Sequence, residues 1–257
     1  MAYETQITRA AEILAASHHA IALTGAGHST PSGIPDFRSP ESGLWEQVDP
    51  MTVASIWGFQ QDPQAFYDWI RPLAKKMAQA QPNPAHLALA ELEQMGVIKA
   101  VCTQNIDELH YRAGSKRVLE LHGSTRQATC LRCGHKVPST ELWPVVVERG
   151  EVPYCPKCQG VLKPDVVLFG ELLPMDVLLE AQRETERCDV MLVAGSSLEV
   201  YPAAELPMRA WQHGAQVILI NYHPTDMDSR ASVVIHANVA TVMPQIVAQV
   251  KELRGIA

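Results

Sequence analysis

Short apolar runs, separated by segments with helical periodicity, make up most of the chain. The first run, Ala20–Thr24 (AIALT), follows the segment Ile7–Ala16, in which apolar residues recur at helical spacing. A short apolar run that ends in glycines is typical of a strand buried on both faces of a sheet. We therefore expect an amphipathic helix followed by a central β-strand.

The same alternation continues to the end of the chain. Apolar runs predict further strands at Ile98–Thr103, Val118–Leu121, Val190–Ala194, Val217–Ile220 and Val233–His236. Helical patterns occupy His86–Met95, Met175–Arg187, Ala203–Gln212 and Thr241–Leu253. Strands that alternate with helices form a parallel sheet covered on both faces. The expected fold class is α/β, a doubly wound, Rossmann-like parallel sheet.

Two stretches interrupt this alternation and predict a smaller lobe. Residues 39–81 are rich in Trp, Gln and Pro and have helical spacing without strands, whereas residues 127–164 hold four of the six cysteines. We expect residues 1–38, 82–126 and 165–257 to form the Rossmann-like domain. Residues 39–81 are then a helical insertion, and residues 127–164 are a separate metal-binding module.

The four cysteines of this module have the spacing of a zinc site. They form two C-x-x-C pairs separated by 21 residues, and the pairs are Cys130 with Cys133 and Cys155 with Cys158. Two such knuckles place four thiolates around one ion in a tetrahedron, which leaves no position open for a substrate. A redox dithiol needs only one such pair, and iron–sulfur clusters use other spacings. We predict one structural Zn²⁺, and we expect the other two cysteines, Cys102 and Cys188, to be small buried residues.

Composition and charge narrow the class of protein. With 47% hydrophobic and 19% charged residues, the chain has the balance of a globular protein rather than of a disordered one. Its net charge of −7 argues against binding nucleic acid through the phosphates. The start of the chain does not resemble a signal peptide, and no apolar run is long enough to span a membrane. We expect a cytoplasmic monomer that binds neither membrane nor nucleic acid.

A glycine-rich loop follows the first strand. The segment Gly25-Ala26-Gly27-His28-Ser29-Thr30 has two glycines that let a backbone approach a pyrophosphate, but Thr30 replaces the third glycine of the dinucleotide fingerprint. Pro31 and Pro35 then force a loop instead of the usual helix. A conventional dehydrogenase is therefore disfavoured.

Polar residues follow three other predicted strands. Thr103-Gln-Asn-Ile-Asp107 follows Ile98–Cys102, His122 and Gly123 follow Val118–Leu121, and Gly195-Ser-Ser197 follows Val190–Ala194. The carboxyl ends of the strands in a doubly wound sheet share one edge, where ligands bind. A lone histidine after a strand is more often structural than catalytic, but these groups converge on the same edge and favour a site there.

Together these motifs resemble the sirtuin family of NAD-dependent protein deacylases, in particular its bacterial and archaeal members. The matching motifs are GAGHSTPSGIPDFR (25–38), TQNID (103–107), HG (122–123), the four cysteines and GSS (195–197). The resemblance implies a protein-lysine deacylase that cleaves NAD to nicotinamide and O-acyl-ADP-ribose and frees the lysine. It implies no hydride transfer. His122 would be the general base, a role that suits an imidazole with a pKa near neutrality.

The resemblance also implies roles for individual residues. Asp107 and Ile106 would bind the nicotinamide carboxamide, and Asn105 would orient the ribose or the attacking water, so the expected catalytic residues are His122, Asn105 and Asp107. The other residues expected to contact NAD are Gly25, Ala26, Gly27, Thr30, Asp36, Phe37, Arg38, Gln104, Gly195, Ser196, Ser197, Asn221 and Ala240.

An acyl-lysine peptide is the implied protein substrate. It would add a β-strand between two segments, whose expected contact residues are Val167, Phe169, Gly170, Glu199, Val200 and Tyr201. Family members that prefer acidic acyl groups carry Tyr-x-x-Arg, whereas this chain has Tyr67 and Ile70 at the matching positions. Acetyl or longer apolar acyl groups are therefore preferred. Two other positions depart from the family pattern: we expect His28 to face solvent and Glu199 to be exposed or to favour basic flanking residues.

Two other functions stay open at this point. An enzyme of the same fold could mainly transfer ADP-ribose to proteins. A non-catalytic sensor of NAD or ADP-ribose is disfavoured because binding alone would not need His122, Asn105 and Asp107.

Overall fold

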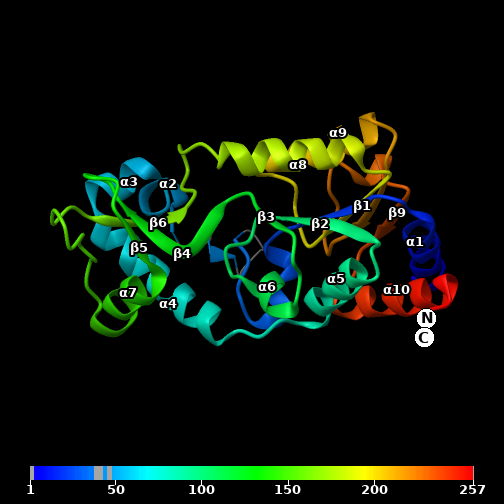
Figure 1. Ribbon diagram of the computed structural model, residues 1–257, viewed down its shortest axis with the longest axis horizontal. Coiled ribbons are helices and arrows are strands. Elements are labelled where there is room, and N and C mark those ends of the chain that lie inside the picture. The colour runs from blue at the N-terminus through cyan, green and yellow to red at the C-terminus, as the bar shows by residue number, and fades with distance from the viewer. Residues whose placement is uncertain (1–2, 38–42, 45–47, 257) are drawn as a thin grey trace. The chain divides into compact units, whose positions relative to one another are not determined.

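The computed structural model describes residues 3–37, 43–44 and 48–256. It divides the chain into two compact units (Figure 1). Unit 1 contains residues 1–32, 81–121 and 175–257, and unit 2 contains residues 33–80 and 122–174. Each unit is therefore assembled from segments that are far apart in the sequence.

Unit 1 is built on a six-stranded sheet in the order β3-β2-β1-β7-β8-β9, in which every pair of neighbours is parallel. The order reverses between β1 and β7, the arrangement of a doubly wound Rossmann-like fold. This confirms the predicted fold class and the predicted strands to within one residue at each end. The strands are β1 Ala20–Thr24, β2 Ile98–Thr103, β3 Val118–Glu120, β7 Val190–Ala194, β8 Gln216–Ile220 and β9 Val233–Ile235.

Helices cover both faces of this sheet (Figure 1). The first face carries α1 Glu4–Ala16, α5 Pro84–Gln94 and α10 Val239–Arg254, which pack against one another and share a buried aliphatic core with the strands. On the other face are α8 Met175–Arg187 and α9 Leu206–Gln212, and a short helix, α6 Leu109–Ala113, follows β2. The predicted helix Ala203–Gln212 is in fact a 3₁₀ turn, Ala203–Glu205, followed by α9.

The start of α5 shows how local sequence positions part of the site. Asn83 caps the helix by accepting a hydrogen bond from the Ala85 N–H at 2.9 Å, and Pro84 occupies the first turn. The Asn83 side chain also donates to the His28 carbonyl at 2.8 Å. This cap therefore ties the helix to the loop that follows β1.

Unit 2 combines helices with a small antiparallel sheet. Its helices are α2 Pro50–Val53, α3 Ile56–Gln61, α4 Pro63–Gln79 and α7 Ser139–Pro144, the last continuing into a π turn, Val145–Arg149. The sheet has the order β5-β4-β6, formed by β4 Gly123–Cys130, β5 Lys136–Pro138 and β6 Leu162–Val166. We did not predict these strands because β4 is mostly polar (GSTRQATC) and lacks an apolar run.

The interior of unit 2 holds three aromatic side chains. The rings of Phe59, Phe66 and Tyr67 lie edge to face, with centroids 5.0 to 5.9 Å apart. The Tyr67 hydroxyl donates to the Leu162 carbonyl at 2.6 Å, which joins α4 to β6. The helical insertion and the cysteine-bearing sheet thus share one core.

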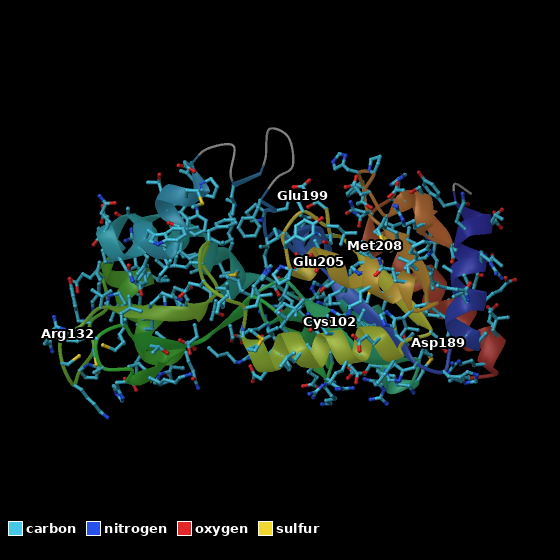
Figure 2. All side chains as sticks on the ribbon, turned by 90° about the horizontal axis from the view of Figure 1, so that it is seen from above. Cys102, Arg132, Asp189, Glu199, Glu205 and Met208 are labelled. Atoms are coloured by element: carbon cyan, nitrogen blue, oxygen red, sulfur yellow. The ribbon has the colours of Figure 1, made fainter. Side chains whose placement is uncertain are left out.

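The two cysteines outside the C-x-x-C pairs are buried, as predicted. Cys102 on β2 (labelled in Figure 2) is fully buried, and Cys188 is nearly so. Burial raises the pKa of both thiols to about 12, so neither is a reactive thiolate. Within the described part of the chain, no helix is long and apolar enough to cross a membrane.

Candidate active site and metal centre

Three loops at the carboxyl edge of the unit 1 sheet are joined by side-chain hydrogen bonds. The loop after β2 supplies Asn105, whose amide donates to the Gly25 carbonyl at 2.9 Å and to Ser29 Oγ at 3.1 Å. Gln104 donates to Ser196 Oγ, in the loop after β7, at 2.9 Å. The strand ends are also tied, because Thr24 Oγ1 donates to Thr103 Oγ1 at 2.8 Å. The structure therefore brings together the residues that the sequence placed on separate strands.

Asp107 is the carboxylate of this cluster. It is 8% exposed and accepts hydrogen bonds from the Ser29 hydroxyl at 2.6 Å and from the Leu109 N–H at 2.9 Å. Burial raises the pKa of this carboxyl above its ordinary range, although the two hydrogen bonds oppose the shift. Ser29 was missing from our expected site residues, even though it belongs to the glycine-loop motif, because only the folded chain shows that it links Asp107 to Asn105.

Replacing Asp107 by asparagine should separate stability from activity. Because folding raises its pKa, the ionised carboxyl costs stability at pH values above its ordinary range, and the cost disappears at acid pH, where the group is protonated in both states. The Asp107→Asn variant removes this pH-dependent cost but replaces one of the two acceptor oxygens by an amide nitrogen, so its unfolding temperature should vary less with pH than that of the parent. Its NAD-dependent nicotinamide release should fall about 10- to 100-fold, the cost of losing a charge-assisted hydrogen bond.

Thermal unfolding at several pH values, together with nicotinamide release, tests this expectation. An exposed carboxylate, in the variant Asp226→Asn, serves as the control. Full activity in Asp107→Asn would remove Asp107 from the site.

The glycines of the first loop pack closely against the loop after β7. A Cβ on Gly25 or Gly27 would lie 2.9 or 3.0 Å from the Gly195 carbonyl oxygen. Gly195 has φ +67°, and a Cβ there would lie 2.2 Å from the His28 backbone nitrogen. These glycines are therefore required by loop packing, in addition to the phosphate approach for which we predicted them.

We predict that Gly195→Ala costs about 3 kcal/mol or more in the free energy of unfolding, because backbone strain and a backbone clash add together. Gly214→Ala is a matched control, since Gly214 also has a positive φ of +92° but a Cβ there would meet no atom within 4 Å. Urea denaturation of both variants measures the difference. Equal losses of stability would show that the clash is relieved at no cost.

The remaining predicted residues of unit 1 lie in or beside the loops at this edge of the sheet, and they differ in how deeply they are buried. Ala26, Gly27 and Thr30 are partly exposed on two 3₁₀ turns, the second of which contains Pro31, whereas His28 and Ser29 between them are buried. Ile106 is half-buried, Ser196 is buried and Ser197 is exposed. Asn221 is nearly buried and donates to the His223 carbonyl. Ala240 is in the first turn of α10, which contacts the turn Ala26–His28.

The structure corrects the expectation for the side chain of His28. We expected its side chain to face solvent, but it is 0% exposed. Sequence alone did not indicate this, because the burial results from packing against two other histidines, His86 and His110.

Other predicted site residues belong to unit 2. Asp36 and Phe37 are half-buried, whereas Arg38 lies outside the described residues. The half-buried His122 precedes β4, and its carbonyl accepts a hydrogen bond from the Val167 N–H at 2.9 Å. Gly123 has φ +75°, and a Cβ there would lie 2.1 Å from the Asp165 carbonyl oxygen, which explains why glycine follows this histidine.

The expected peptide-binding segments are placed as follows. In unit 2, the N–H groups of Val167 and Phe169 donate to His122 and Ala54, and the Phe169 carbonyl accepts from Ile56. Gly170 lies against the ring of Trp57. In unit 1, Glu199 (labelled in Figure 2) and Tyr201 are exposed and Val200 is half-buried, in the loop after β7.

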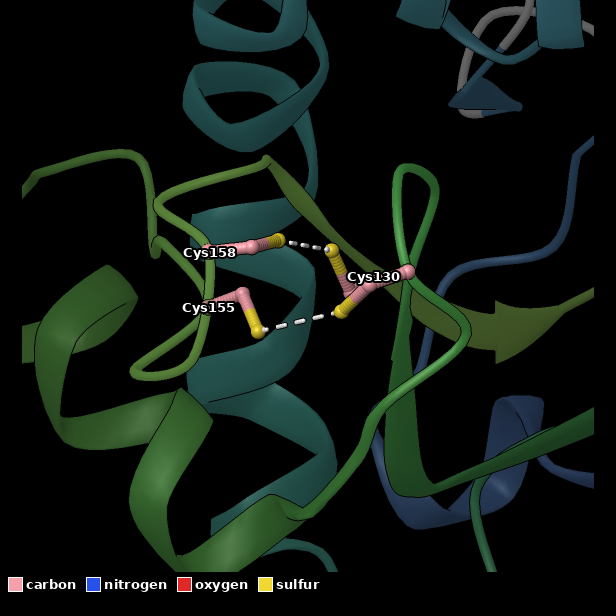
Figure 3. Close-up of side chains that lie close together, drawn as sticks. Cys130, Cys155 and Cys158 are labelled. Atoms are coloured by element: carbon pink, nitrogen blue, oxygen red, sulfur yellow. Dashed lines mark hydrogen bonds between the residues drawn. The ribbon is translucent and has the colours of Figure 1, made fainter.

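The four predicted zinc ligands converge in unit 2, and Figure 3 shows the sulfur of Cys158 directed toward that of Cys130. The Sγ atoms of Cys130 and Cys158 are 3.5 Å apart, and those of Cys133 and Cys155 are 3.8 Å apart. A tetrahedral Zn²⁺ with Zn–S bonds of about 2.3 Å separates its sulfurs by about 3.8 Å. The cluster therefore fits one zinc ion bound by four thiolates.

A Rossmann-like sheet with a polar, glycine-lined carboxyl edge, joined to a unit with a four-cysteine metal centre, defines a nucleotide-binding α/β protein with a structural zinc. The sequence model of the Sir2 family matches residues 25–202. The chain is 52% identical to NAD-dependent protein deacylase 2 of Archaeoglobus fulgidus over 98% of its own length and 99% of that protein. The chain therefore belongs to the Sir2 family.

Solved structures of similar chains support the same family assignment. One, from work on the mechanism and regulation of Sir2 enzymes, is 51% identical with a TM-score of 0.93, and the match covers 98% of this chain and 100% of that one. Another is Sir2Af2 bound to a myristoylated histone peptide, which is 46% identical with a TM-score of 0.85 over 99% of this chain and 100% of that one. The family and fold predicted from the motifs are confirmed.

Proposed function

We propose that the protein is an NAD-dependent protein-lysine deacylase. The observation that carries the proposal is the hydrogen-bonded cluster of Asn105, Asp107 and Ser29 at the carboxyl edge of the sheet, against the glycine loop. The archaeal relative named as a deacylase, which covers nearly the whole chain, supports the same conclusion.

When bound, NAD would supply an electrophilic ribose carbon at its bond to nicotinamide. The carboxylate of Asp107 would accept a hydrogen bond from the carboxamide, and the backbone of Ile106 would contact the same group. Asn105 is held by Gly25 and Ser29 and orients the ribose or a water molecule. Because Asp107 and Asn105 are both tied to Ser29, their relative positions are set before NAD binds.

His122 acts as the general base in this proposal. Its ring would accept a proton from a ribose hydroxyl of bound NAD, while its backbone is anchored by the Val167 N–H. The positive φ of Gly123 directs the chain from His122 into β4. Arg38, although outside the described residues, remains part of the proposed NAD site.

An acyl-lysine peptide is the proposed substrate, with Val167, Phe169, Gly170, Glu199, Val200 and Tyr201 as its contacts. The structure constrains how a peptide strand could pair with the first of these segments. Three consecutive N–H groups, those of Val167, Leu168 and Phe169, already donate to His122, Glu171 and Ala54. A peptide must therefore use other backbone groups there, such as the Gly170 N–H.

We predict that the enzyme prefers apolar to acidic acyl groups. Tyr67 is committed to the Leu162 carbonyl, and Arg71 is committed to Asp68, Val146 and Gly150, so neither side chain is available to an acyl carboxylate. Unit 2 also contains a cavity of about 120 Å³, lined by Pro35, Leu44, Val48, Trp69, Pro72, Leu73 and Lys76.

The measurement is kcat/KM for acetyl, myristoyl and succinyl versions of one peptide. Acetyl or myristoyl peptide should be preferred to the succinyl peptide by at least about 10-fold, as expected when a carboxylate is desolvated without a partner. A preference for the succinyl peptide would mean that Lys76 at the cavity pairs with the acid.

Mass spectrometry of an acetyl-lysine peptide, incubated with the protein with and without NAD, tests the function itself. We expect deacetylated peptide, nicotinamide and O-acetyl-ADP-ribose in equal amounts, only when NAD is present. Transfer of ADP-ribose to protein without deacylation would replace this proposal by the transferase alternative. Binding of NAD with no turnover of any acyl peptide would favour a sensor.

The proposal includes a monomer that acts in the cytoplasm. Four thiolates that hold zinc need a reducing compartment, which supports the location. Light scattering after size-exclusion chromatography tests the oligomeric state.

A further inference from the structure

Three histidines from separate elements meet inside unit 1. His28 is in the 3₁₀ turn after β1, His86 is in the first turn of α5, and His110 is in α6. All three are buried, with exposed fractions of 0, 0 and 2%. Their ring centroids are 4.6 to 5.2 Å apart, and one nitrogen from each ring lies within 4.8 Å of the others. We call this set the histidine cluster.

His110 has an unshared lone pair on one ring nitrogen. Its Nε2 is 2.8 Å from Thr24 Oγ1, and that hydroxyl gives its own proton to Thr103. Thr24 must therefore accept a hydrogen from His110, so Nε2 carries the proton and Nδ1 carries the lone pair. Among the described residues this Nδ1 has no hydrogen-bond partner.

The ring of His28 is also poorly paired. Neither Nδ1 nor Nε2 makes a hydrogen bond of good geometry in the described part of the chain, and a marginal backbone contact with Ala85 is the smallest influence on the pKa of the ring. Burial, with the neighbouring histidines, lowers the pKa of both His28 and His110 well below the ordinary value. Both rings are therefore neutral near pH 7, and neutral imidazole is the form that binds metals.

Among the described residues, the hydrogen bonds of the His86 ring are long. Its Nδ1 accepts from the Asn83 N–H at 3.3 Å, and its Nε2 is 3.4 Å from Ser29 Oγ. Burial lowers the pKa of this ring to about 4, so it is also neutral. Such long bonds are weak, and giving them up frees a nitrogen of His86 as a third ligand.

We propose that the histidine cluster binds a first-row transition-metal ion through nitrogens of His28, His86 and His110. Three imidazoles select zinc, cobalt, nickel or copper over magnesium or calcium, which prefer oxygen ligands. Metal–nitrogen bonds of about 2.0–2.1 Å would place the nitrogens about 3.3 Å apart, so the rings must close by up to about 1.5 Å. Three ligands leave one position open, with Ser29 Oγ beside His86.

Ser29 connects the histidine cluster to the proposed active site. Ser29 contacts His86 on one side and donates to Asp107 on the other. The metal site itself does not depend on the proposed function, because its test measures bound metal and not turnover.

The test loads the intact, zinc-containing protein with Co²⁺. One sample is incubated with excess Co²⁺ for a day and another is produced in Co²⁺-supplemented medium, because a fully buried site exchanges slowly. Metal per chain is then measured by mass spectrometry, together with the visible spectrum. We expect one cobalt in addition to one zinc, with cobalt bands that lack sulfur-to-metal charge transfer.

Variants assign the site. His28→Val should lose the additional cobalt and its bands while keeping the zinc. A second variant, His86→Gln, should do the same and guards against a folding defect in the first. His213→Ala is the matched control, since the His213 ring is exposed and hydrogen-bonds to the Arg209 carbonyl in α9, and this variant should keep the cobalt.

Two results would overturn the proposal. The first is one metal per chain in both samples of the parent protein, which would mean that a water molecule, or nothing, occupies the cluster. The second is additional cobalt that survives in both His28→Val and His86→Gln, which would place the ion elsewhere.

Discussion

Replacing His122 by alanine should lower the kcat/KM for deacylation by about 10²- to 10⁴-fold, the usual contribution of a general base. The substitution removes the ring but keeps the backbone bond between the His122 carbonyl and the Val167 N–H. Zinc content and the unfolding temperature should therefore stay close to those of the parent. Steady-state kinetics, zinc analysis and a thermal melt make the three measurements.

The control for this prediction is His18→Ala, which removes an exposed imidazole and keeps the backbone bond from His18 to Asp189. This variant should retain full activity. A near-normal rate in His122→Ala would make the assignment of the base wrong. A large drop in its unfolding temperature would mean that the ring is structural and that the kinetic loss is indirect.

Replacing Cys155 by alanine should eliminate bound zinc and unfold much of unit 2. Cys155 is fully buried, and its Sγ is 3.8 Å from that of Cys133. Loss of one ligand leaves three thiolates and an open position, and metal binding at such sites is folding free energy. The unfolding temperature should fall by more than about 10 °C, the result of losing several kcal/mol in a protein of this size.

Cys188→Ala is the matched control, because it removes a buried thiol outside the zinc cluster. The Cys188 thiol donates a hydrogen bond to the Thr185 carbonyl, and its loss should shift the unfolding temperature by only a few degrees. Zinc should remain at one ion per chain. A stable, metal-free and active Cys155→Ala protein would contradict a structural role for the metal.

Local sequence was sufficient for much of the fold. The strands β1 and β7 match the predicted runs because each is a short, continuous apolar segment followed by glycine, the pattern typical of a strand covered on both faces, and β2 departs from it only at Lys99. The polar strand β4 was missed for the opposite reason. Its pairing with β5 and β6 depends on the cysteine knuckles and on neighbouring strands, none of which appears in its own pattern.

Some features of the candidate site could also be predicted from the sequence, and others could not. The C-x-x-C spacing predicted the zinc cluster, since two residues between cysteines are enough to direct both thiolates at one ion. The motifs also predicted which residues follow the strands. Their links could not be predicted: Ser29 joins Asn105 to Asp107, although it is 76 and 78 residues away from them in the chain.

By itself, the sequence of this protein determined its parallel sheet, its zinc ligands and its membership of the Sir2 family, because these depend on periodicity and spacing over short distances. Only the tertiary structure decided that Gly195 must be a glycine, that Phe169 pairs with the segment before α3, and that His28 is buried beside His86 and His110. Each of these is a contact between segments that are distant in the chain. The packing of the whole unit sets such contacts, and no local pattern of residues encodes them.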